Sequence, residues 1–269
     1  MLFVTRLTPR TLRLGKCALV PHHPVVIAPF TDRTPPAALA RAARQGLDLF
    51  EARVDLFQHP GAVSTAKQLA AAKKLLPVLL TVRSAKEGGS YDRSEASRLE
   101  LYGALLKGVS AIDVELAAEI RADVVAAAKK AKRHVVLSHH DFVRTPSERE
   151  LDRVVTRGFD AGADIVKVAA QVTDDADCAR LAALFTLYPG RALVVVGMGE
   201  HGKKTRIFFP ALGSRFTFAS LDRATAPGQL DLGATQRALA LFYPDYAARI
   251  ARPTPSPLPR PRRARVAGR

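Results

Sequence analysis

The sequence predicts an α/β chain that folds as a (β/α)8 barrel, also called a TIM barrel. Apolar runs of strand length recur along the chain, and successive runs begin 22 to 33 residues apart. The segments between them are amphipathic and rich in Ala, Leu and Arg, which is typical of helices. Near-continuous apolar strands that alternate with helices indicate a parallel sheet covered on both faces. Eight such units in about 230 residues favour a closed barrel over a doubly wound sheet.

Each predicted strand is a short apolar run, usually rich in β-branched residues. The eight strands are 25–30, 47–53, 77–83, 110–115, 134–140, 163–169, 191–198 and 216–220. The clearest predicted helices are 36–46, 92–107, 116–132 and 146–158. Thr145 is predicted to cap the helix that follows it, with Pro146 at the first helical position, and Asp231 is predicted to cap the last helix. The alternative, an open Rossmann-like sheet, lacks the glycine-rich turn that should follow an early strand.

The chain divides into three parts by composition. Residues 1–23 are predicted to form an N-terminal arm; their positive charge resembles a transit peptide, but they lack a cleavage site of small residues. Residues 24–251 form the predicted barrel. Residues 252–269 contain six Arg, five Pro and no acidic residue, so we expect a disordered tail. This tail is either a solvated extension without function or a contact for nucleic acid or acidic surfaces.

Charge and hydropathy restrict the classes of function. No apolar run approaches the ~18 residues that span a bilayer, so we expect a soluble, cytoplasmic protein without a membrane partner. Two cysteines far apart in sequence exclude a disulfide framework and a cysteine metal site. The tail accounts for six of the sixteen net positive charges, and the remaining excess suits an enzyme with a small anionic substrate.

Polar residues gather where the predicted strands end. They are Glu51 and Arg53, Arg83, Asp113 and Glu115, Ser138 and His140, and Lys167. Active sites of (β/α)8 barrels lie at the carboxyl ends of the strands, and residues two apart on a strand share a face. Charges also mark strand ends simply because the chain becomes solvated there. Five consecutive strands that end in this way, with both signs of charge and a histidine, favour a site.

Lys167 stands inside a buried apolar strand, A-D-I-V-K-V-A-A at 163–170. Burial there is costly for an ammonium, and nearby Arg53 and Arg83 would further favour the neutral amine. A neutral amine can attack a ketone or aldehyde, and the resulting iminium acidifies the adjacent C–H bond. The alternative is a structural ion pair of Lys167 with Asp113 or Glu115. The strand alone does not separate the two interpretations.

His140 ends the neighbouring strand and favours the catalytic interpretation. A neutral imidazole there can remove an acidified proton and later protonate a leaving group. His139 points the other way by strand parity, so we expect it to be structural. Glu87 is suited to orient His140 from the loop after the third strand, where Gly88 and a following glycine allow a sharp turn. Alternatively, the K-E-G-G segment is only a glycine-rich turn.

Taken together, these residues match a known family. The chain resembles type I 3-dehydroquinate dehydratases from about residue 24 to 245. The matching motifs are E-A-R-V-D (51–55), T-V-R-S-A-K-E-G-G (81–89), D-V-E-L (113–116), S-H-H-D-F-V-R-T-P (138–146), D-I-V-K-V-A (164–169), M-G-E-H-G-K-K-T-R (198–206) and A-T-A-P-G-Q (224–229). The resemblance implies a (β/α)8 barrel, usually a homodimer, that uses neither metal nor organic cofactor. It also implies the conversion of 3-dehydroquinate to 3-dehydroshikimate in the shikimate pathway, which supplies aromatic amino acids.

The resemblance also implies a role for each site residue. By motif, Lys167 is similar to the Schiff-base lysine, His140 to the general acid and base, and Glu87 to its supporting carboxylate. The positions that bind substrate are Arg206 and Gln229 at the carboxylate, and Glu51, Arg53, Arg83 and Thr225 elsewhere in the site. Thr225 replaces a common serine and keeps the hydroxyl. Ala28 also replaces a common serine, so we expect one substrate hydrogen bond worth ~1 kcal/mol to be lost.

Two other functions compete with this assignment. Another aldolase-type Schiff-base lyase also needs a strand lysine, but has no reason to possess the S-H-H-D-F and A-P-G-Q motifs together. A non-catalytic protein that binds nucleic acid through its basic surface would not need Lys167 or His140, and its binding would be sensitive to salt. We expect a dehydratase with a small anionic substrate rather than a nucleic-acid partner.

Overall fold

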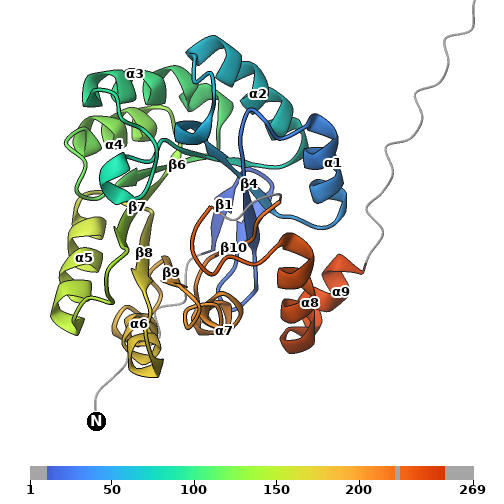
Figure 1. Cartoon of the computed structure of the whole chain (residues 1–269), viewed down its shortest axis with the longest axis vertical. Helices are drawn as coiled ribbons and strands as arrows, with labels where there is room; N and C mark the ends of the chain where they lie inside the picture. The colour runs from blue at the N-terminus through green and yellow to red at the C-terminus, as the bar shows by residue number, and fades with distance from the viewer. Residues whose placement is uncertain (1–10, 222–224, 252–269) are drawn as a thin grey trace, which may run out of the picture.

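The computed structural model describes residues 11–221 and 225–251, and its centre is a parallel eight-stranded sheet in the order β10-β3-β4-β5-β6-β7-β8-β9 (Figure 1). The strands are β3 (Val26–Phe30), β4 (Leu49–Arg53), β5 (Val78–Thr81), β6 (Ala111–Glu115), β7 (His134–Asp141), β8 (Ile165–Gln171), β9 (Leu193–Met198) and β10 (Thr217–Phe218). A backbone hydrogen bond from Arg215 to Leu193, of 2.8 Å, joins the two edges of the sheet at their amino ends. The predicted barrel is confirmed, and each predicted strand overlaps an observed one.

Helices surround the sheet and cover its outer face (Figure 1). They are α1 (Pro36–Arg44), α2 (Ala62–Leu75), α3 (Glu95–Leu105), α4 (Arg121–Lys130), α5 (Glu148–Asp160), α6 (Asp175–Leu187), α7 (Thr205–Leu212), α8 (Leu232–Phe242) and α9 (Pro244–Ile250). Short 3-10 turns occur at η1 (Val54–Leu56), η2 (Ala85–Glu87) and η3 (Leu106–Gly108). Within the described part of the chain, no helix combines the length and apolar character needed to span a bilayer.

Alternation along each strand divides the core into two layers. Val26 and Phe50 pack outward against the helices, whereas Ile27 and Leu49 pack inside the barrel. Because strands of this kind bury both faces, each appears in the sequence as an unbroken apolar run. Ala28 belongs to the outer layer and does not line the pocket described below, so the expected loss of a substrate hydrogen bond at this position is wrong.

A small hairpin closes the amino end of the barrel. It pairs β1 (Leu12–Leu14) with β2 (Cys17–Leu19) in antiparallel fashion, around Gly15 with φ of 58°. Leu12, Leu14 and Leu19 pack with the inner core beneath the strands. Residues 11–20 of the predicted N-terminal arm therefore contain a structured element. The predicted tail, residues 252–269, lies outside the described residues.

The predicted start of α5 is wrong by two residues. Ser147 is the N-cap, and its backbone N–H and hydroxyl donate to the Glu150 carboxylate at 2.8 and 2.7 Å. Pro146 precedes this cap, and the Thr145 hydroxyl donates instead to the carbonyl of Gln171 at 2.6 Å. The reciprocal serine–glutamate arrangement satisfies the free N–H groups of the first turn. The prediction for Asp231 is confirmed, because its carboxylate accepts from the Ala234 N–H at 2.7 Å.

Candidate active site

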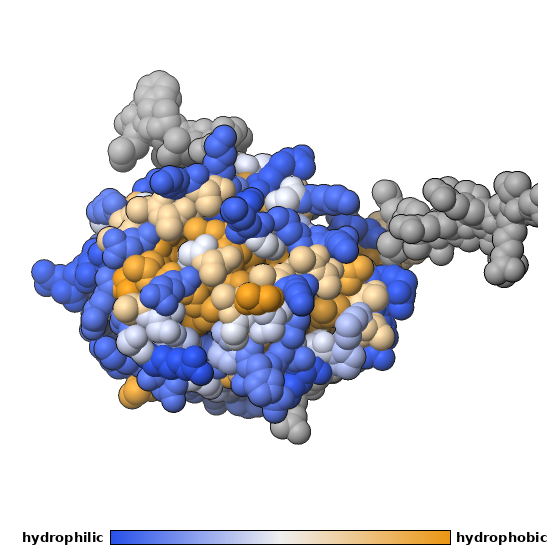
Figure 2. All heavy atoms as spheres, turned by 90° about the horizontal axis from the view of Figure 1, so that it is seen from above, coloured by the Kyte–Doolittle hydropathy of each residue, from blue (hydrophilic) through white to orange (hydrophobic). Residues whose placement is uncertain are grey.

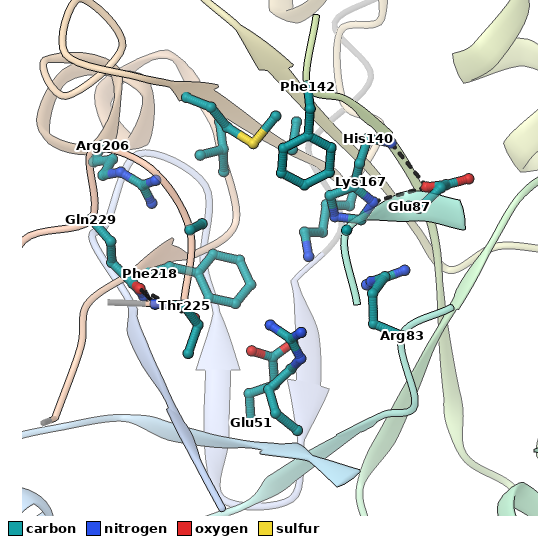
Figure 3. Close-up of a pocket in the computed structure, with 16 residues that line it drawn as sticks. Glu51, Arg83, Glu87, His140, Phe142, Lys167, Arg206, Phe218, Thr225 and Gln229 are labelled. Atoms are coloured by element: carbon teal, nitrogen blue, oxygen red, sulfur yellow. Dashed lines mark hydrogen bonds and ion pairs between the residues drawn. The ribbon is translucent and has the colours of Figure 1, made fainter. Parts of the chain in front are cut away.

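One pocket at the carboxyl ends of the strands gathers all the residues to which the family resemblance assigns a role (Figure 3). Its empty space is about 540 Å³. The nine predicted residues that line it are Glu51, Arg53, Arg83, Glu87, His140, Lys167, Arg206, Thr225 and Gln229. They come from β4, the segments after β5 and β10, β7, β8 and α7. Positions spread over almost 180 residues thus meet because parallel strands bring their carboxyl ends to one rim.

Lys167 lies in the floor of this pocket and is only 6% exposed. Its Nζ is 3.2 Å from Oδ2 of Asp113 and 4.6 Å from the centre of the Phe218 ring. Burial alone would raise the pKa of Asp113, but Arg83, Lys167 and a hydrogen bond from Ser138 hold that pKa below its usual value. The structure thus shows the ion pair with Asp113, and the amine also remains in contact with the pocket.

His140 and Glu87 form a hydrogen-bonded pair beside the amine (Figure 3). Oε2 of Glu87 lies 2.9 Å from Nδ1 of His140 and also accepts the His140 backbone N–H at 3.0 Å. Burial, with the positive charges of Arg83, Lys167 and Arg53, places the pKa of His140 well below its ordinary value. The imidazole is therefore neutral near pH 7, and Nδ1 is the protonated nitrogen if it donates to an ionised Glu87.

The pKa of Glu87 moves in the opposite direction. Burial raises it to about 7, and the negative charges of Glu115 and Asp113 add to this effect while Arg83 opposes it. A carboxyl with such a pKa changes protonation near neutral pH, next to a neutral imidazole. His139 points away, as predicted, and lines a separate surface depression with Asp141, Arg144 and Glu150.

The segment from Ser84 to Tyr91, here called the Glu87 loop, depends on two glycines. Gly88 has φ of 76°, and a Cβ at this position would lie 2.3 Å from the ring of Phe142. A Cβ on Gly89 would lie 2.1 Å from the carbonyl oxygen of Arg83. Only glycine accommodates both the left-handed backbone and these close approaches. The glycines of the K-E-G-G turn therefore allow the backbone path that places Glu87 in the pocket.

Arg53 and Arg83 line the pocket but already have carboxylate partners. Asp55 accepts from Nε and a terminal nitrogen of Arg53 at 3.0 and 2.8 Å. Arg83 contacts Asp113 at 2.7 Å and Glu115 at 3.1 Å. Asp113, Glu115 and Ser138 do not line the pocket, contrary to the expectation for the barrel mouth: they are at most 2% exposed, and each contacts Arg83. Glu51 does line it, and accepts from the Thr81 hydroxyl at 2.8 Å.

Arg206 contrasts with these arginines. It is 3% exposed, and a terminal nitrogen donates to the Pro227 carbonyl at 3.2 Å. Its Nε is buried without a hydrogen-bond partner in the described structure, and none of the described carboxylates forms an ion pair with it. Burial lowers its pKa to about 10, so it remains charged at neutral pH. A buried guanidinium without a counter-charge favours an incoming anion.

Gln229 and Thr225 lie beside Arg206, across the pocket from His140 (Figure 3). Oε1 of Gln229 accepts from the backbone N–H and the hydroxyl of Thr225 at 2.7 and 3.2 Å, and Nε2 donates to the Ala219 carbonyl at 3.0 Å. These bonds fix the segment that follows β10 over one side of the pocket. Arg206, Gln229 and Thr225 thus lie on the opposite side of the pocket from the imidazole (Figure 3).

The sequence analysis missed the less polar part of the lining. These residues are Gly88, Phe142, Ala169, Val196, Met198, Phe218 and Ala226. The Phe142 ring stacks on His140 with centroids 6.3 Å apart and planes inclined by 17°. Strand parity offered a signal for some of them, because Ala169 is two residues beyond Lys167, and Val196 and Met198 are two apart at the end of β9. Phe142 follows a strand end, where parity no longer applies.

The fold and the pocket place the chain in the class of (β/α)8 barrel enzymes. An amine, a neutral imidazole and a guanidinium without a carboxylate partner among the described residues share one pocket, and groups of these kinds can attack a carbonyl, transfer a proton and bind an anion. The profile of the family described as Type I 3-dehydroquinase matches residues 26–245. The chain belongs to this family.

Individual relatives agree with the family assignment. The 3-dehydroquinate dehydratase of Methanosarcina barkeri is 37% identical over 213 residues, which cover 75% of this chain and 88% of that protein. The enzyme of the same name from Methanothermobacter thermautotrophicus is 34% identical, over 82% of this chain and 98% of its own. The crystal structure of 3-dehydroquinate dehydratase from Geobacillus kaustophilus superposes with a TM-score of 0.80 at 25% identity, over 88% of this chain and 98% of that one.

Proposed function

We propose that this protein is a hydro-lyase that converts 3-dehydroquinate to 3-dehydroshikimate and water through a Schiff base on Lys167. The observation that carries the proposal is the meeting of Lys167, His140 and Arg206 in one pocket, where the Arg206 guanidinium has no carboxylate partner among the described residues. The substrate is a β-hydroxy ketone with a carboxylate, so its dehydration needs an amine, a base and an anion site together. Family membership and the names of the relatives support the same reaction.

Each step has a group suited to it. The Lys167 ammonium first gives one proton to a base of the pocket, and the amine attacks the ketone carbon. That proton then returns to the carbinolamine hydroxyl, which leaves as water and gives an iminium that draws electrons from the neighbouring C–H bond. His140, neutral because of its lowered pKa, takes the proton of this C–H bond and then protonates the β-hydroxyl as it leaves. Water finally hydrolyses the imine, which releases the product and restores the amine. None of these steps needs a metal or an organic cofactor.

The remaining side chains bind and orient in this proposal. Arg206 and Gln229 hold the substrate carboxylate on the side away from the amine (Figure 3). Glu51, Arg53, Arg83 and Thr225 then face the ring hydroxyls and the rest of the site. Glu87 accepts a hydrogen bond from the Nδ1–H of His140, and this leaves the other imidazole nitrogen unprotonated and able to act as the base.

The direct test is turnover of 3-dehydroquinate, followed by the ultraviolet absorbance of the conjugated product. We expect wild-type protein to be active after dialysis against a chelator and without any added cofactor. His140→Ala should lower kcat by at least ~10²–10⁴-fold, the usual loss for a general acid and base. His139→Ala is the matched control and should leave kcat nearly unchanged, because its side chain lies outside the pocket. An inactive His139→Ala with a normal His140→Ala would contradict the proposed base.

A further inference from the structure

The Glu87 loop is held in shape partly by its own backbone. Arg83 accepts the Tyr91 N–H at 3.2 Å, Tyr91 accepts the Ala85 N–H at 3.1 Å, and Ser84 accepts the Gly89 N–H at 3.0 Å. These bonds close the loop but do not fix it to the barrel. Its position relative to His140 therefore depends on the contacts of Glu87 with His140 and on contacts made at the two ends of the loop.

Glu115, at the end of β6, holds the first end. Its Oε1 accepts the backbone N–H of Ser84 at 2.9 Å and lies 3.1 Å from a terminal nitrogen of Arg83. Its Oε2 accepts from Arg98 of α3 at 2.9 Å. Glu115 is 2% exposed and does not line the pocket. One buried carboxylate thus contacts a pocket arginine, the loop and a helix at once.

Asp55, in the η1 turn after β4, holds the other end in the same way. Its carboxylate makes the two-pronged contact with Arg53, and Oδ2 also accepts the backbone N–H of Ser90 at 3.2 Å. The side chain of Asp55 is completely buried. Two carboxylates, one at the end of β6 and one in the turn after β4, therefore contact the two ends of one loop, and each also contacts one arginine of the pocket.

We propose that Glu115 and Asp55 are positioning residues that couple Arg83 and Arg53 to the loop carrying Glu87. The inference rests on the proposed function, in which Glu87 orients His140. A shift of the loop would lengthen the bond of 2.9 Å between Glu87 and His140, and misplacement by about 1 Å can cost a factor of about 100 in rate. Neither carboxylate reaches the substrate, so both act through the residues that they hold.

The charge of Glu115 supports the coupling. The groups that act on Glu87 are Arg83 from the end of β5, Glu115 and Asp113 from β6, and the His140 backbone from β7. Glu115 raises the pKa of Glu87. Replacement of Glu115 by neutral Gln should therefore move the acidic limb of the kcat/KM profile to lower pH. A change that only lowered stability would not move this limb.

The experiment compares E115Q and D55N with E95Q. Glu95 is the matched control, because it also contacts Arg98, at 2.9 Å, but touches neither Arg83 nor the Glu87 loop. We expect kcat to fall by about 10- to 100-fold in E115Q and D55N. This decrease should be larger than any increase in KM. Hydrogen exchange of residues 84–91 should be at least about threefold faster in both variants, and unchanged in E95Q. If E115Q fails to fold, D55N carries the same comparison.

Two results would overturn the inference. One is a kcat and an exchange rate in E115Q and D55N within about threefold of those in E95Q. The other is a loss of kcat in E95Q equal to that in E115Q, which would indicate an effect through Arg98 and not through the loop. If wild-type protein does not turn over 3-dehydroquinate, the proposed function fails, and hydrogen exchange alone then decides whether the two carboxylates hold the loop.

Discussion

Glu87 and His140 show how burial changes the protonation of two groups that share one hydrogen bond. Burial raises the pKa of the carboxyl to about 7 and lowers that of the imidazole well below its ordinary value. Both shifts favour the neutral form, because a low-dielectric site penalises charge of either sign. The imidazole consequently stays neutral at pH 7, as a general base requires. Glu87 is the group of the pair that titrates near neutral pH.

This pair predicts an acidic limb in the pH profile. As the pH falls below about 7, Glu87 takes up a proton and loses the negative charge that supports protonation of His140, so kcat/KM should fall. Glu87→Gln has no titrating group at this position. We expect its profile to be flatter on the acidic side, with a plateau lowered by about 10- to 100-fold. Rate measurements between about pH 5 and pH 9 check this. An unaltered limb in Glu87→Gln would assign it to another group.

The role proposed for Arg206 predicts weaker substrate binding when its planar guanidinium group is replaced. Arg206→Lys keeps one charge but loses the two-pronged grip, so kcat/KM should fall by the equivalent of about 1–3 kcal/mol. Gln229→Ala should act in the same direction but less strongly. Arg215→Lys is the control, because Arg215 is also a buried arginine but contacts Leu19 at the amino end of the barrel. Unchanged kcat/KM in Arg206→Ala would remove this residue from the site.

At the scale of elements, the strands were predictable and the smaller connections were not. A strand such as β9 (Leu193–Met198) is buried on both faces and is therefore an unbroken apolar run in the sequence. The hairpin strands β1 and β2 have three residues each, which is too short for alternation to stand out. At the start of α5, Thr145 and Ser147 both suit a cap, and only the contact of Ser147 with Glu150 distinguishes them.

The candidate site was predictable to different degrees. Glu51, His140 and Lys167 stand on strands, so parity and strand ends were sufficient to place them together. Arg206 and Gln229 stand on α7 and on the segment after β10, and no spacing rule brings such positions to the pocket. Their assignment depended on family motifs. Glu115 was expected at the barrel mouth, but it pairs with Arg98 on α3 and does not line the pocket.

At the scale of the whole molecule, one face suggests an interface. Figure 2 shows the side on which α2 and α3 lie in Figure 1, with an apolar area in its middle and hydrophilic residues around it. Val63 of α2 is 73% exposed, although it is large and apolar. Apolar surface with a polar rim is typical of contacts between proteins.

We propose that this face supports the homodimer that the family resemblance implies. Sedimentation should then give twice the mass of the 29.0 kDa chain. Val63→Asp should shift the population toward the monomer, because it places a charge on the exposed surface of α2, a helix on this side of the molecule. Wild-type protein that remains monomeric at micromolar concentration would contradict the proposal.

Covalent capture tests the central claim most directly. Wild-type protein is incubated with 3-dehydroquinate and borohydride, and the intact mass and the modified residue are then determined. Reduction of the imine should add one ligand to Lys167 and abolish turnover, whereas Lys167→Ala should give no adduct and lose several orders of magnitude in kcat. An adduct on a different lysine, or full turnover by Lys167→Ala, would contradict the account.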